Sequence, residues 1–230
     1  MAQNKKIILF DIDYVLIDTS KLKEITSDEV VHLLGISKEE IKKVNEEFTQ
    51  TLKSSLEFSP EKFVQFLINL YPQASPKSLA SIYRNPQLYK MVTYPNVFPA
   101  LKRLKGKASL GIFSEGIREF QMAKITLSGL ISYFDQNLIF IYPDKIGKAG
   151  ELVKKLGEIY FVDDNPRHIK DIATAQGTHP IWLKRGPKAE TQETLNYPTI
   201  LSLKELEETL ILPDRQPRLT WSIANDTVSE

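Results

Sequence analysis

Pairs of acidic residues follow two short apolar runs of this sequence. Asp11 and Asp13 come after the first run, and Asp163 and Asp164 come directly after the second. Continuous apolar runs are typical of strands buried in a parallel sheet, and the carboxyl ends of such strands meet at one edge. Carboxylates that meet there repel one another unless a cation lies between them. Because Mg²⁺ prefers oxygen ligands and binds through carboxylates together with substrate phosphate, the four acids predict a magnesium site for phosphate chemistry.

A serine and a lysine complete this set of polar residues. Ser114 ends the apolar run 109–113, where its hydroxyl could cap the next helix or bind an anion beside the free N–H groups of that helix. We assign Ser114 to phosphate binding and not to nucleophilic attack, because it has no Gly-x-Ser-x-Gly surroundings and no paired histidine. Lys145 and Lys148 are alternative sources of an ammonium group that would balance the acids and bind phosphate.

The composition excludes several other chemistries. The chain has no cysteine, which removes disulfides, thiolate zinc sites and cysteine nucleophiles. The histidines, His32, His168 and His179, show no metal-ligand spacing and are interpreted as structural or surface residues. With 30 basic and 29 acidic residues, the net charge of +1 creates no overall field that would attract nucleic acid or an anionic membrane.

The apolar run before Asp11 is too short for a signal-peptide core or a membrane span. We therefore expect a soluble, cytoplasmic protein with neither nucleic-acid nor membrane partners. Its oligomeric state does not follow from the sequence.

Residues 20–85 have the period of helices, because apolar residues recur among lysines and glutamates at spacings of three and four. Capping signals divide the stretch into four helices. In order, these signals are Thr26 or Ser27 before a helix that ends at Gly35, Ser37 with Glu40 before a helix to about Ser55, Ser59-Pro60, and Ser75-Pro76.

Further along the chain, helices and apolar runs alternate. We predict strands over 6–10, 108–113, 137–142, 159–162 and 179–183, and helices over 96–105, 118–128, 148–156, 167–176 and 202–210. This alternation predicts an α/β fold with a Rossmann-like parallel sheet and helices on both faces. Residues 213–230 are polar and contain two prolines, which predicts an extended or disordered tail in which Trp221 could dock on the core.

The order of the motifs resembles the haloacid dehalogenase superfamily, specifically its phosphatase-like members with a helical cap. The motifs are Asp11-Ile12-Asp13-Tyr14-Val15-Leu16-Ile17-Asp18-Thr19, then Ser114, then a lysine, then Val162-Asp163-Asp164-Asn165, and the likeness extends to about Leu212. The resemblance implies a core of residues 1–19 and 86–212. It also implies that residues 20–85 are a mobile cap, inserted after the first strand, that closes over substrate and excludes water.

The resemblance also implies catalytic roles. Asp11 would be the nucleophile that forms an aspartyl-phosphate, and Asp13 would protonate the leaving group and then activate water. Two residues depart from the family's pattern: Tyr14 stands where glycine is frequent, and Glu115 stands where asparagine is frequent. Neither removes a catalytic group, but Glu115 adds an acid near the phosphate.

By the same resemblance, Ser114 and the lysine would hold the phosphoryl oxygens. We favour Lys148 over Lys145 as this lysine, because Lys148 lies at a predicted helix start. The expected magnesium ligands are Asp11, the backbone carbonyl of Asp13, and Asp164, with Asp163 binding directly or through water.

Together these features predict a magnesium-dependent phosphatase that hydrolyses a small phosphorylated metabolite, a phosphomonoester, through an aspartyl-phosphate. One alternative is a phosphomutase of a sugar phosphate. Another is a catalytically idle binding or regulatory module, which is disfavoured because an idle site has no physical reason to keep so many like charges together. Dehalogenase activity is disfavoured because that branch lacks the second acid, and Asp13 is present.

Overall fold

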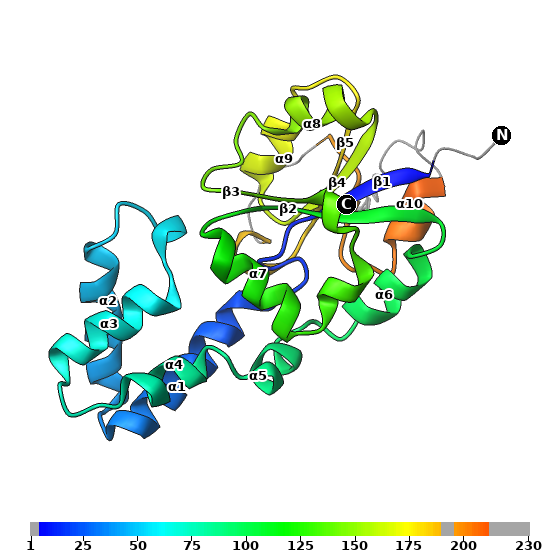
Figure 1. The fold of residues 1–230 in the computed structure, drawn as a ribbon. Helices are drawn as coiled ribbons and strands as arrows, with labels where there is room; N and C mark the ends of the chain where they lie inside the picture. Colours follow the sequence, from blue (N-terminus) through cyan, green and yellow to red (C-terminus); the bar gives the residue numbers. More distant parts are fainter. Residues whose placement is uncertain (1–4, 190–195, 212–230) are drawn as a thin grey trace, which may run out of the picture.

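The computed structural model describes residues 5–189 and 196–211, in which six strands form one sheet (Figure 1). The strand order is β3-β2-β1-β4-β5-β6, and all neighbouring strands are parallel. The strands are β1 (Lys6–Phe10), β2 (Ala108–Glu115), β3 (Ile139–Tyr142), β4 (Ile159–Asp163), β5 (Thr178–Leu183) and β6 (Thr199–Ile200). The predicted Rossmann-like sheet is confirmed. Only β6 was not predicted, because two residues are too few for a periodic pattern.

Helices cover both faces of the sheet, which explains why its strands are continuous apolar runs. Along β1, Ile8 and Phe10 pack in the core on one face, whereas Leu9 packs in the core on the other face. The helices are α6 (Val97–Leu104), α7 (Arg118–Leu127) and α10 (Leu206–Ile211) on the first face, and α8 (Ala149–Leu156) and α9 (Pro166–Ile172) on the second (Figure 1).

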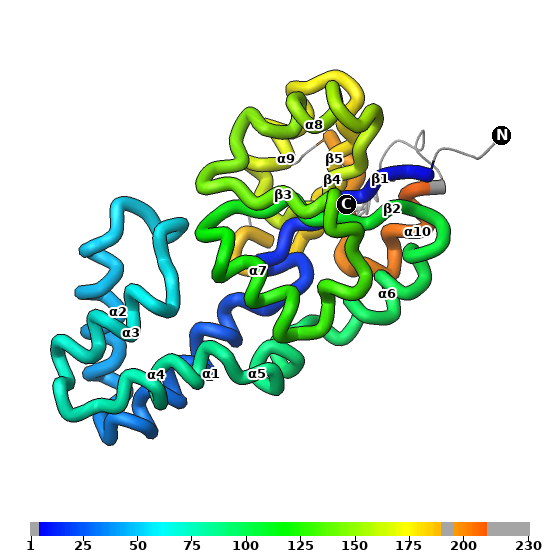
Figure 2. Tube along the Cα trace, in the orientation of Figure 1, coloured from blue at the N-terminus to red at the C-terminus, as the bar shows by residue number. Residues whose placement is uncertain are grey.

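A helical insertion, residues 19–82, lies beside the sheet and has a hydrophobic core of its own. Its helices are α1 (Thr19–Leu34), α2 (Lys38–Gln50), α3 (Pro60–Leu70) and α4 (Pro76–Ile82). Figure 2 shows the chain leaving the sheet after β1 and returning through α5 (Pro86–Met91). Because Leu88 and Tyr89 of α5 pack in the core of the sheet, α5 belongs with the sheet and not with the insertion.

The structure corrects the start of the first helix. The N-cap is Asp18, whose carboxylate accepts a hydrogen bond from the Lys21 N–H, and not Thr26 or Ser27. The Thr26 hydroxyl instead donates to the carbonyl of Leu22, one turn earlier in the same helix. A threonine that bonds backward in this way is compatible with a helix interior, so its presence did not mark a helix start.

Other helix boundaries agree more closely or differ at one end. Gly35 ends α1 in the left-handed conformation, and Ser37, Ser59 and Ser75 cap α2, α3 and α4 as predicted. In contrast, α2 ends at Gln50 and not near Ser55, α9 ends before residue 176, and α10 begins later than residue 202. The predicted tail, including Trp221, lies outside the described residues. None of the described helices combines the length and apolarity needed to cross a membrane.

Candidate active site

The site lies where the strand order reverses, at the carboxyl end of β1 between β2 and β4. A crevice forms at such a point because the connections from the neighbouring strands lead away in opposite directions. The Asp11 N–H donates to the Val162 carbonyl at 2.9 Å, which fixes Asp11 against β4. From β2, the Ser114 hydroxyl donates to Asp11 Oδ1 at 2.7 Å. Ser114 therefore lies within a strand and is not a helix cap, because β2 continues to Glu115.

Lys145 joins two of the predicted acids. Its side chain is only 1% exposed, and its Nζ lies 2.7 Å from Asp11 Oδ2 and 2.6 Å from Asp163 Oδ2. Lys148, by contrast, lies on the surface, where its Nζ pairs with Glu151 at 2.9 Å. The structure thus corrects our preference for Lys148. The loop that follows β3 carries Lys145 over the end of the sheet, whereas the start of α8 directs Lys148 to solvent.

Asp163 is saturated by its neighbours. Besides Lys145 on Oδ2, its Oδ1 accepts a hydrogen bond from the Asn165 N–H at 2.8 Å and lies 3.2 Å from His168 Nδ1. The other ring nitrogen of His168 lies 3.3 Å from Glu115 Oε1. Although burial opposes charging, these two carboxylates raise the pKa of His168 to about 9. His168 is therefore a buried cation that neutralises the additional acid Glu115.

The charges of this inner cluster, defined as Asp11, Lys145, Asp163 and His168, depend on one another. Burial disfavours the charged form of Asp163, but Lys145 and His168 hold the pKa of that carboxyl below its usual range. Burial raises the pKa of Asp11, and the neighbouring Asp163 contributes, while Lys145 opposes the shift. Burial would lower the pKa of Lys145, yet the two carboxylates raise it, so its ammonium stays charged.

Asp164 is in the opposite situation from its neighbour. It is 4% exposed, and its carboxylate accepts no hydrogen bond from any part of the chain that the structure describes. Burial, together with repulsion by Asp163 and Asp11, raises its pKa to about 8. A buried carboxyl without a donor is costly, and a divalent cation beside it would remove that cost. The surroundings of Asp164 therefore fit the magnesium ion that the resemblance implies.

The inner cluster is a less suitable place for the same ion. One ligand atom from each of Asp11, Asp163 and His168 lies within 4.8 Å of the others. However, Lys145 already bridges Asp11 and Asp163, and a protonated histidine cannot coordinate a metal. A further cation would meet two positive charges there.

Asp13 is held from the other side of the crevice by Lys124 of α7. The Lys124 Nζ lies 2.6 and 2.8 Å from the two carboxylate oxygens of Asp13, and the lysine side chain is 4% exposed. Gln121 Nε2 donates to Asp13 at 2.9 Å, and the Thr19 hydroxyl donates at 2.5 Å. Despite its burial, these donors hold the pKa of Asp13 below its usual range.

Three of these residues, Gln121, Lys124 and His168, were not assigned to the site from the sequence. Gln121 and Lys124 are three apart in α7 and share its buried face with Ile125. Two polar residues on the buried side of an amphipathic helix were the available signal, because such groups require a partner. For His168, the signal was the additional acid Glu115, which needs a neutralising cation when half-buried.

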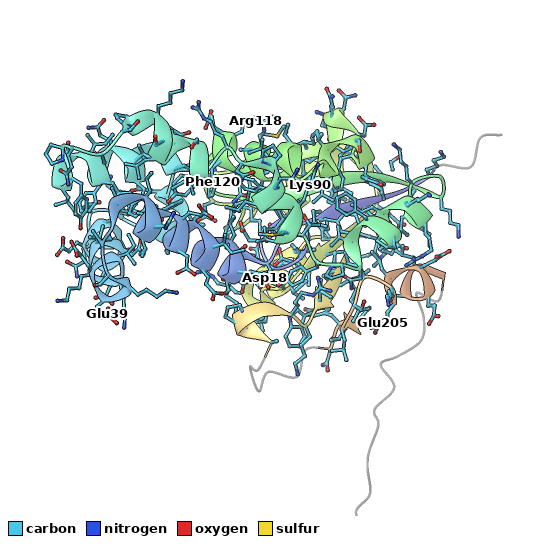
Figure 3. All side chains as sticks on the ribbon, turned by 90° about the horizontal axis from the view of Figure 1, so that it is seen from below. Asp18, Glu39, Lys90, Arg118, Phe120 and Glu205 are labelled. Carbon is cyan, nitrogen blue, oxygen red and sulfur yellow. The ribbon has the colours of Figure 1, made fainter. Side chains whose placement is uncertain are left out.

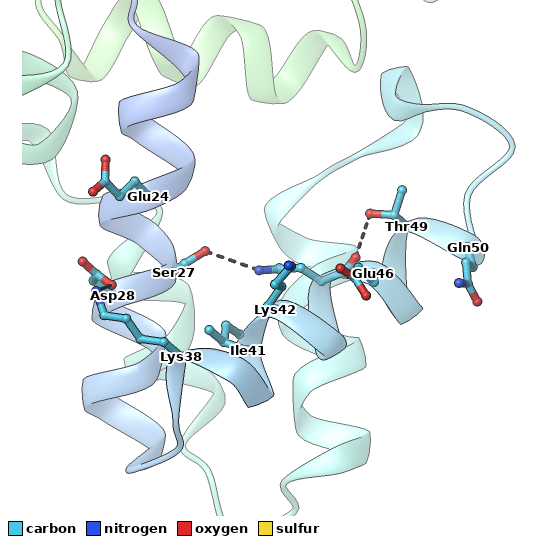
Figure 4. Close-up of a pocket in the computed structure, with 10 residues that line it drawn as sticks. Glu24, Ser27, Asp28, Lys38, Ile41, Lys42, Glu46, Thr49 and Gln50 are labelled. Atoms are coloured by element: carbon cyan, nitrogen blue, oxygen red, sulfur yellow. Dashed lines mark hydrogen bonds and ion pairs between the residues drawn. The ribbon is translucent and has the colours of Figure 1, made fainter.

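A pocket of about 470 Å³ connects the acids with the helical insertion. Asp11, Asp13 and Asp164 line one end, and residues of α2 such as Phe48 line the other. A second hollow of about 570 Å³ lies between α1 and α2 (Figure 4). It is bordered by the Lys38–Asp28 ion pair and has none of the site acids in its lining. The first pocket is therefore the candidate substrate site.

The sheet, the inserted helices and the acids at the end of β1 define a hydrolase of the haloacid dehalogenase class. The model of the haloacid dehalogenase-like hydrolase family matches residues 8–145, more than half of the chain. The chain belongs to this family. The comparison with curated proteins gives no match.

Solved structures of the same class share the fold. A haloacid dehalogenase-like hydrolase from Burkholderia xenovorans LB400 is 18% identical, with a TM-score of 0.71 over 90% of this chain and 96% of that chain. The magnesium-bound HAD-hydrolase YfnB from Bacillus subtilis is 18% identical, with a TM-score of 0.57 over 90% and 99%. The L-2-haloacid dehalogenase from Xanthobacter autotrophicus is 15% identical, with a TM-score of 0.55 over 90% and 98%.

Proposed function

We propose that this hydrolase is a magnesium-dependent phosphatase that hydrolyses a small phosphomonoester through an aspartyl-phosphate on Asp11. The observation that carries the proposal is the convergence of Asp11, Ser114 and Lys145. Each oxygen of Asp11 touches one of the other two side chains, at 2.7 Å in both cases. A phosphoryl group attached to Asp11 would therefore lie within reach of a hydroxyl and an ammonium that stabilise its oxygens.

The chemistry has two steps. Asp11 attacks phosphorus as the bond to the leaving oxygen breaks, and Asp13 supplies the proton that this oxygen takes up. Asp13 would carry that proton once the negative charge of the bound phosphate raises its pKa from the low value of the free protein. Water then attacks the phosphorus of the aspartyl-phosphate, Asp13 accepts the proton of that water, and phosphate leaves Asp11. Dividing hydrolysis in this way replaces one difficult step with two easier ones. Lys124, Gln121 and Thr19 fix the orientation of Asp13 for both proton transfers.

The residues proposed to hold magnesium are Asp11, the backbone carbonyl of Asp13, and Asp164. When bound, the ion would neutralise charge on the phosphoryl oxygens. Asp163 would support the site from behind, because Lys145, His168 and the Asn165 N–H occupy its oxygens. In the same proposal, residues 20–85 act as a cap over a core formed by residues 1–19 and 86–212. The pocket between the acids and the insertion would receive the substrate.

The test is phosphate release from a panel of phosphomonoesters in the presence of MgCl₂. We expect activity in the wild type, none above background in Asp11→Asn, and none after chelation of the metal. Asp135→Asn is the matched control, because Asp135 is an exposed acid that caps a turn away from the site. Activity that survives Asp11→Asn or chelation would contradict the proposal.

One observation favours a second candidate, a 2-haloacid dehalogenase. Asp13 is already engaged by Lys124, Gln121 and Thr19, and a departing halide needs no proton from it. Several structural neighbours are named as 2-haloacid dehalogenases. Halide release from 2-chloropropionate without metal, in the absence of any phosphatase activity, would favour this candidate. Transfer of labelled phosphate back to a sugar phosphate would instead indicate a phosphomutase.

A further inference from the structure

The pocket beyond the acids is lined by aromatic and aliphatic side chains together with polar ones such as Lys23 and Asn45. Several of the aromatic and aliphatic ones are only half-buried, so they present apolar surface to the pocket. These half-buried residues are Tyr14, Leu52, Leu56, Phe58, Ile117 and Phe120. A volume of about 470 Å³ is in the range of pockets that enclose a small organic ligand. The apolar surface begins beside Asp13, where the leaving group of a phosphomonoester bound at Asp11 would lie.

The backbone of Tyr14 indicates that its side chain has a role in this pocket. Its φ is +57°, and it is the one non-glycine residue with a positive φ among those that the structure describes. A bulky residue in this region is strained, and such strain persists where the surrounding structure uses the side chain. Glycine would adopt the same backbone without that cost. The protein therefore tolerates a strained backbone at position 14, and in return has an aromatic ring next to Asp13.

The ring of Tyr14 is held in place by its surroundings. A Cβ at Gly186 would lie 2.8 Å from the ring, so the ring packs directly against the backbone of that glycine. The Tyr14 hydroxyl lies 3.2 Å from the Ser20 hydroxyl, within hydrogen-bonding distance. Both contacts fix the ring at the edge of the pocket. A fixed ring offers a ligand apolar contact area at little conformational cost.

A second aromatic surface connects the site with the helical insertion. Phe120 of α7 lies with its ring 5.5 Å from the ring of Phe58, and Figure 3 labels Phe120 where the insertion meets the core. The Lys124 Nζ, which binds Asp13, lies 4.6 Å from the Phe120 ring centroid. Phe58 in turn packs at 5.9 Å on Phe48, in the core of the insertion. The aromatic surface is thus continuous from the proton-transferring acid to the insertion.

We propose that this pocket binds an aryl or arylalkyl leaving group, with Tyr14 and Phe120 as specificity-determining residues. The inference rests on the proposed phosphatase function and names its substrate class. Aromatic rings of the substrate would contact the rings of Tyr14 and Phe120, and its phosphate would lie at Asp11. A leaving group rich in hydroxyls would lose water where it covers these two rings, without gaining hydrogen bonds from them.

The first test compares benzyl phosphate with glycerol 3-phosphate. Both substrates release a primary alcohol, so the ratio of their kcat/KM values measures recognition of the leaving group. We expect kcat/KM to be at least about tenfold higher for benzyl phosphate, a difference typical of an apolar contact in an enzyme pocket. A ratio of one or less would overturn the inference and leave the phosphatase function standing.

Substitutions in the pocket test which side chains produce the preference for benzyl phosphate. Tyr14→Gly removes the ring and relieves the strained backbone, so it should fold, and we expect the ratio to fall about tenfold. Tyr14→Phe keeps the ring and should keep the ratio. Phe120→Leu should lower the ratio about threefold or more, whereas Phe98→Leu, which alters a ring paired with Tyr133 outside the pocket, should not change it. Unchanged ratios in Tyr14→Gly and Phe120→Leu would overturn the assignment.

Binding of a phosphonate keeps the inference testable if no substrate is hydrolysed. Calorimetric titration would compare benzylphosphonate with methylphosphonate in the presence of MgCl₂. Benzylphosphonate that binds about tenfold more tightly, and loses this advantage in Tyr14→Gly, would support the aromatic site even where the phosphatase function fails. Equal binding of the two compounds would overturn the inference.

Discussion

The inner cluster and the pocket face of the site contain similar charges in different surroundings. We define the pocket face as Asp13, Lys124 and Asp164. In the inner cluster, both carboxylates have a cationic partner. Lys145 contacts Asp11 and Asp163, and His168 contacts Asp163 as well. On the pocket face, Asp13 has Lys124, but the described residues provide Asp164 with no donor. The inner cluster is therefore complete without a ligand, whereas the pocket face leaves one carboxyl for an incoming cation to satisfy.

Removing the cation from the inner cluster should have the largest effect. Lys145→Met leaves Asp11 and Asp163 buried without their shared partner, and we expect the free energy of unfolding to fall by about 3–5 kcal/mol. Phosphate release should fall at least about 100-fold, because a preorganised donor to the phosphoryl oxygens is lost. Urea denaturation and steady-state kinetics measure the two effects.

Lys148→Met is the matched control for that experiment. The Lys148 side chain is 38% exposed and pairs with the surface residue Glu151, so its replacement should change the free energy of unfolding by no more than about 0.5 kcal/mol. If both variants lost the same activity, the structural distinction between the two lysines would be wrong.

The second effect in size is a pH dependence in the inner cluster. The pKa of His168 is raised from 6.5 to about 9 in the folded protein. The folded state therefore holds this proton more tightly, and the stability it contributes is full below pH 6.5 and is lost as the pH rises through 9. The shift corresponds to about 3 kcal/mol.

His168→Gln isolates this contribution. We expect the wild type to be more stable than the variant at pH 6, and the difference to shrink steadily up to pH 10, as measured by urea denaturation. Other titrating groups, including Asp164, also change the free energy of unfolding with pH. Their contribution is the same in the wild type and the variant, so it largely cancels in the difference. A difference that does not vary with pH would show that His168 is not charged in the folded protein.

The same comparison explains what could be predicted from the sequence. Asp11, Asp163 and Asp164 follow apolar runs directly, so the rule for parallel sheets was enough to bring them together. The fold followed for a similar reason, because strands buried on both faces and amphipathic helices leave regular patterns. These positions depend on the backbone alone, and the backbone pattern can be read along the chain.

Positions set by side-chain reach could not be predicted in this way. Lys145 and Lys148 are three residues apart in one loop-to-helix segment, and only the path of the loop over the sheet decides which ammonium is buried. Lys124 reaches Asp13 from a helix more than 100 residues later in the chain. The difference between Asp163 and Asp164 likewise depends on donors from the loop and α9, which the motif itself does not specify.

On the pocket face, Lys124→Met should have a moderate effect on catalysis. Asp13 would keep Thr19 and Gln121 but lose the ammonium that holds both of its oxygens. We expect kcat to fall about 100-fold with a smaller change in KM, because proton transfer depends on the orientation of Asp13.

Two further variants serve as a rescue and a control for Lys124→Met. Lys124→Arg should recover part of kcat, because it restores a charged donor. Lys102→Met, which replaces an exposed lysine of α6, should leave kcat unchanged. If Lys124→Met left kcat unchanged for substrates with poor leaving groups, Lys124 would have no part in orienting Asp13.

The last effect has the opposite sign and tests the comparison most directly. The pKa of Asp164 is raised to about 8 in the folded protein, so its ionisation costs stability as the pH rises from about 4 through 8. Without metal, Asp164→Asn should therefore stabilise the protein at pH 9, and should have little effect at pH 4. Asp163→Asn should destabilise it, because Lys145 and His168 would lose a partner.

Added MgCl₂ should raise the Tm of the wild type but not that of Asp164→Asn, because only the wild type has a carboxyl there that an ion would satisfy. If both variants destabilised the metal-free protein equally, Asp164 would be part of the framework, and the proposed metal position would be wrong.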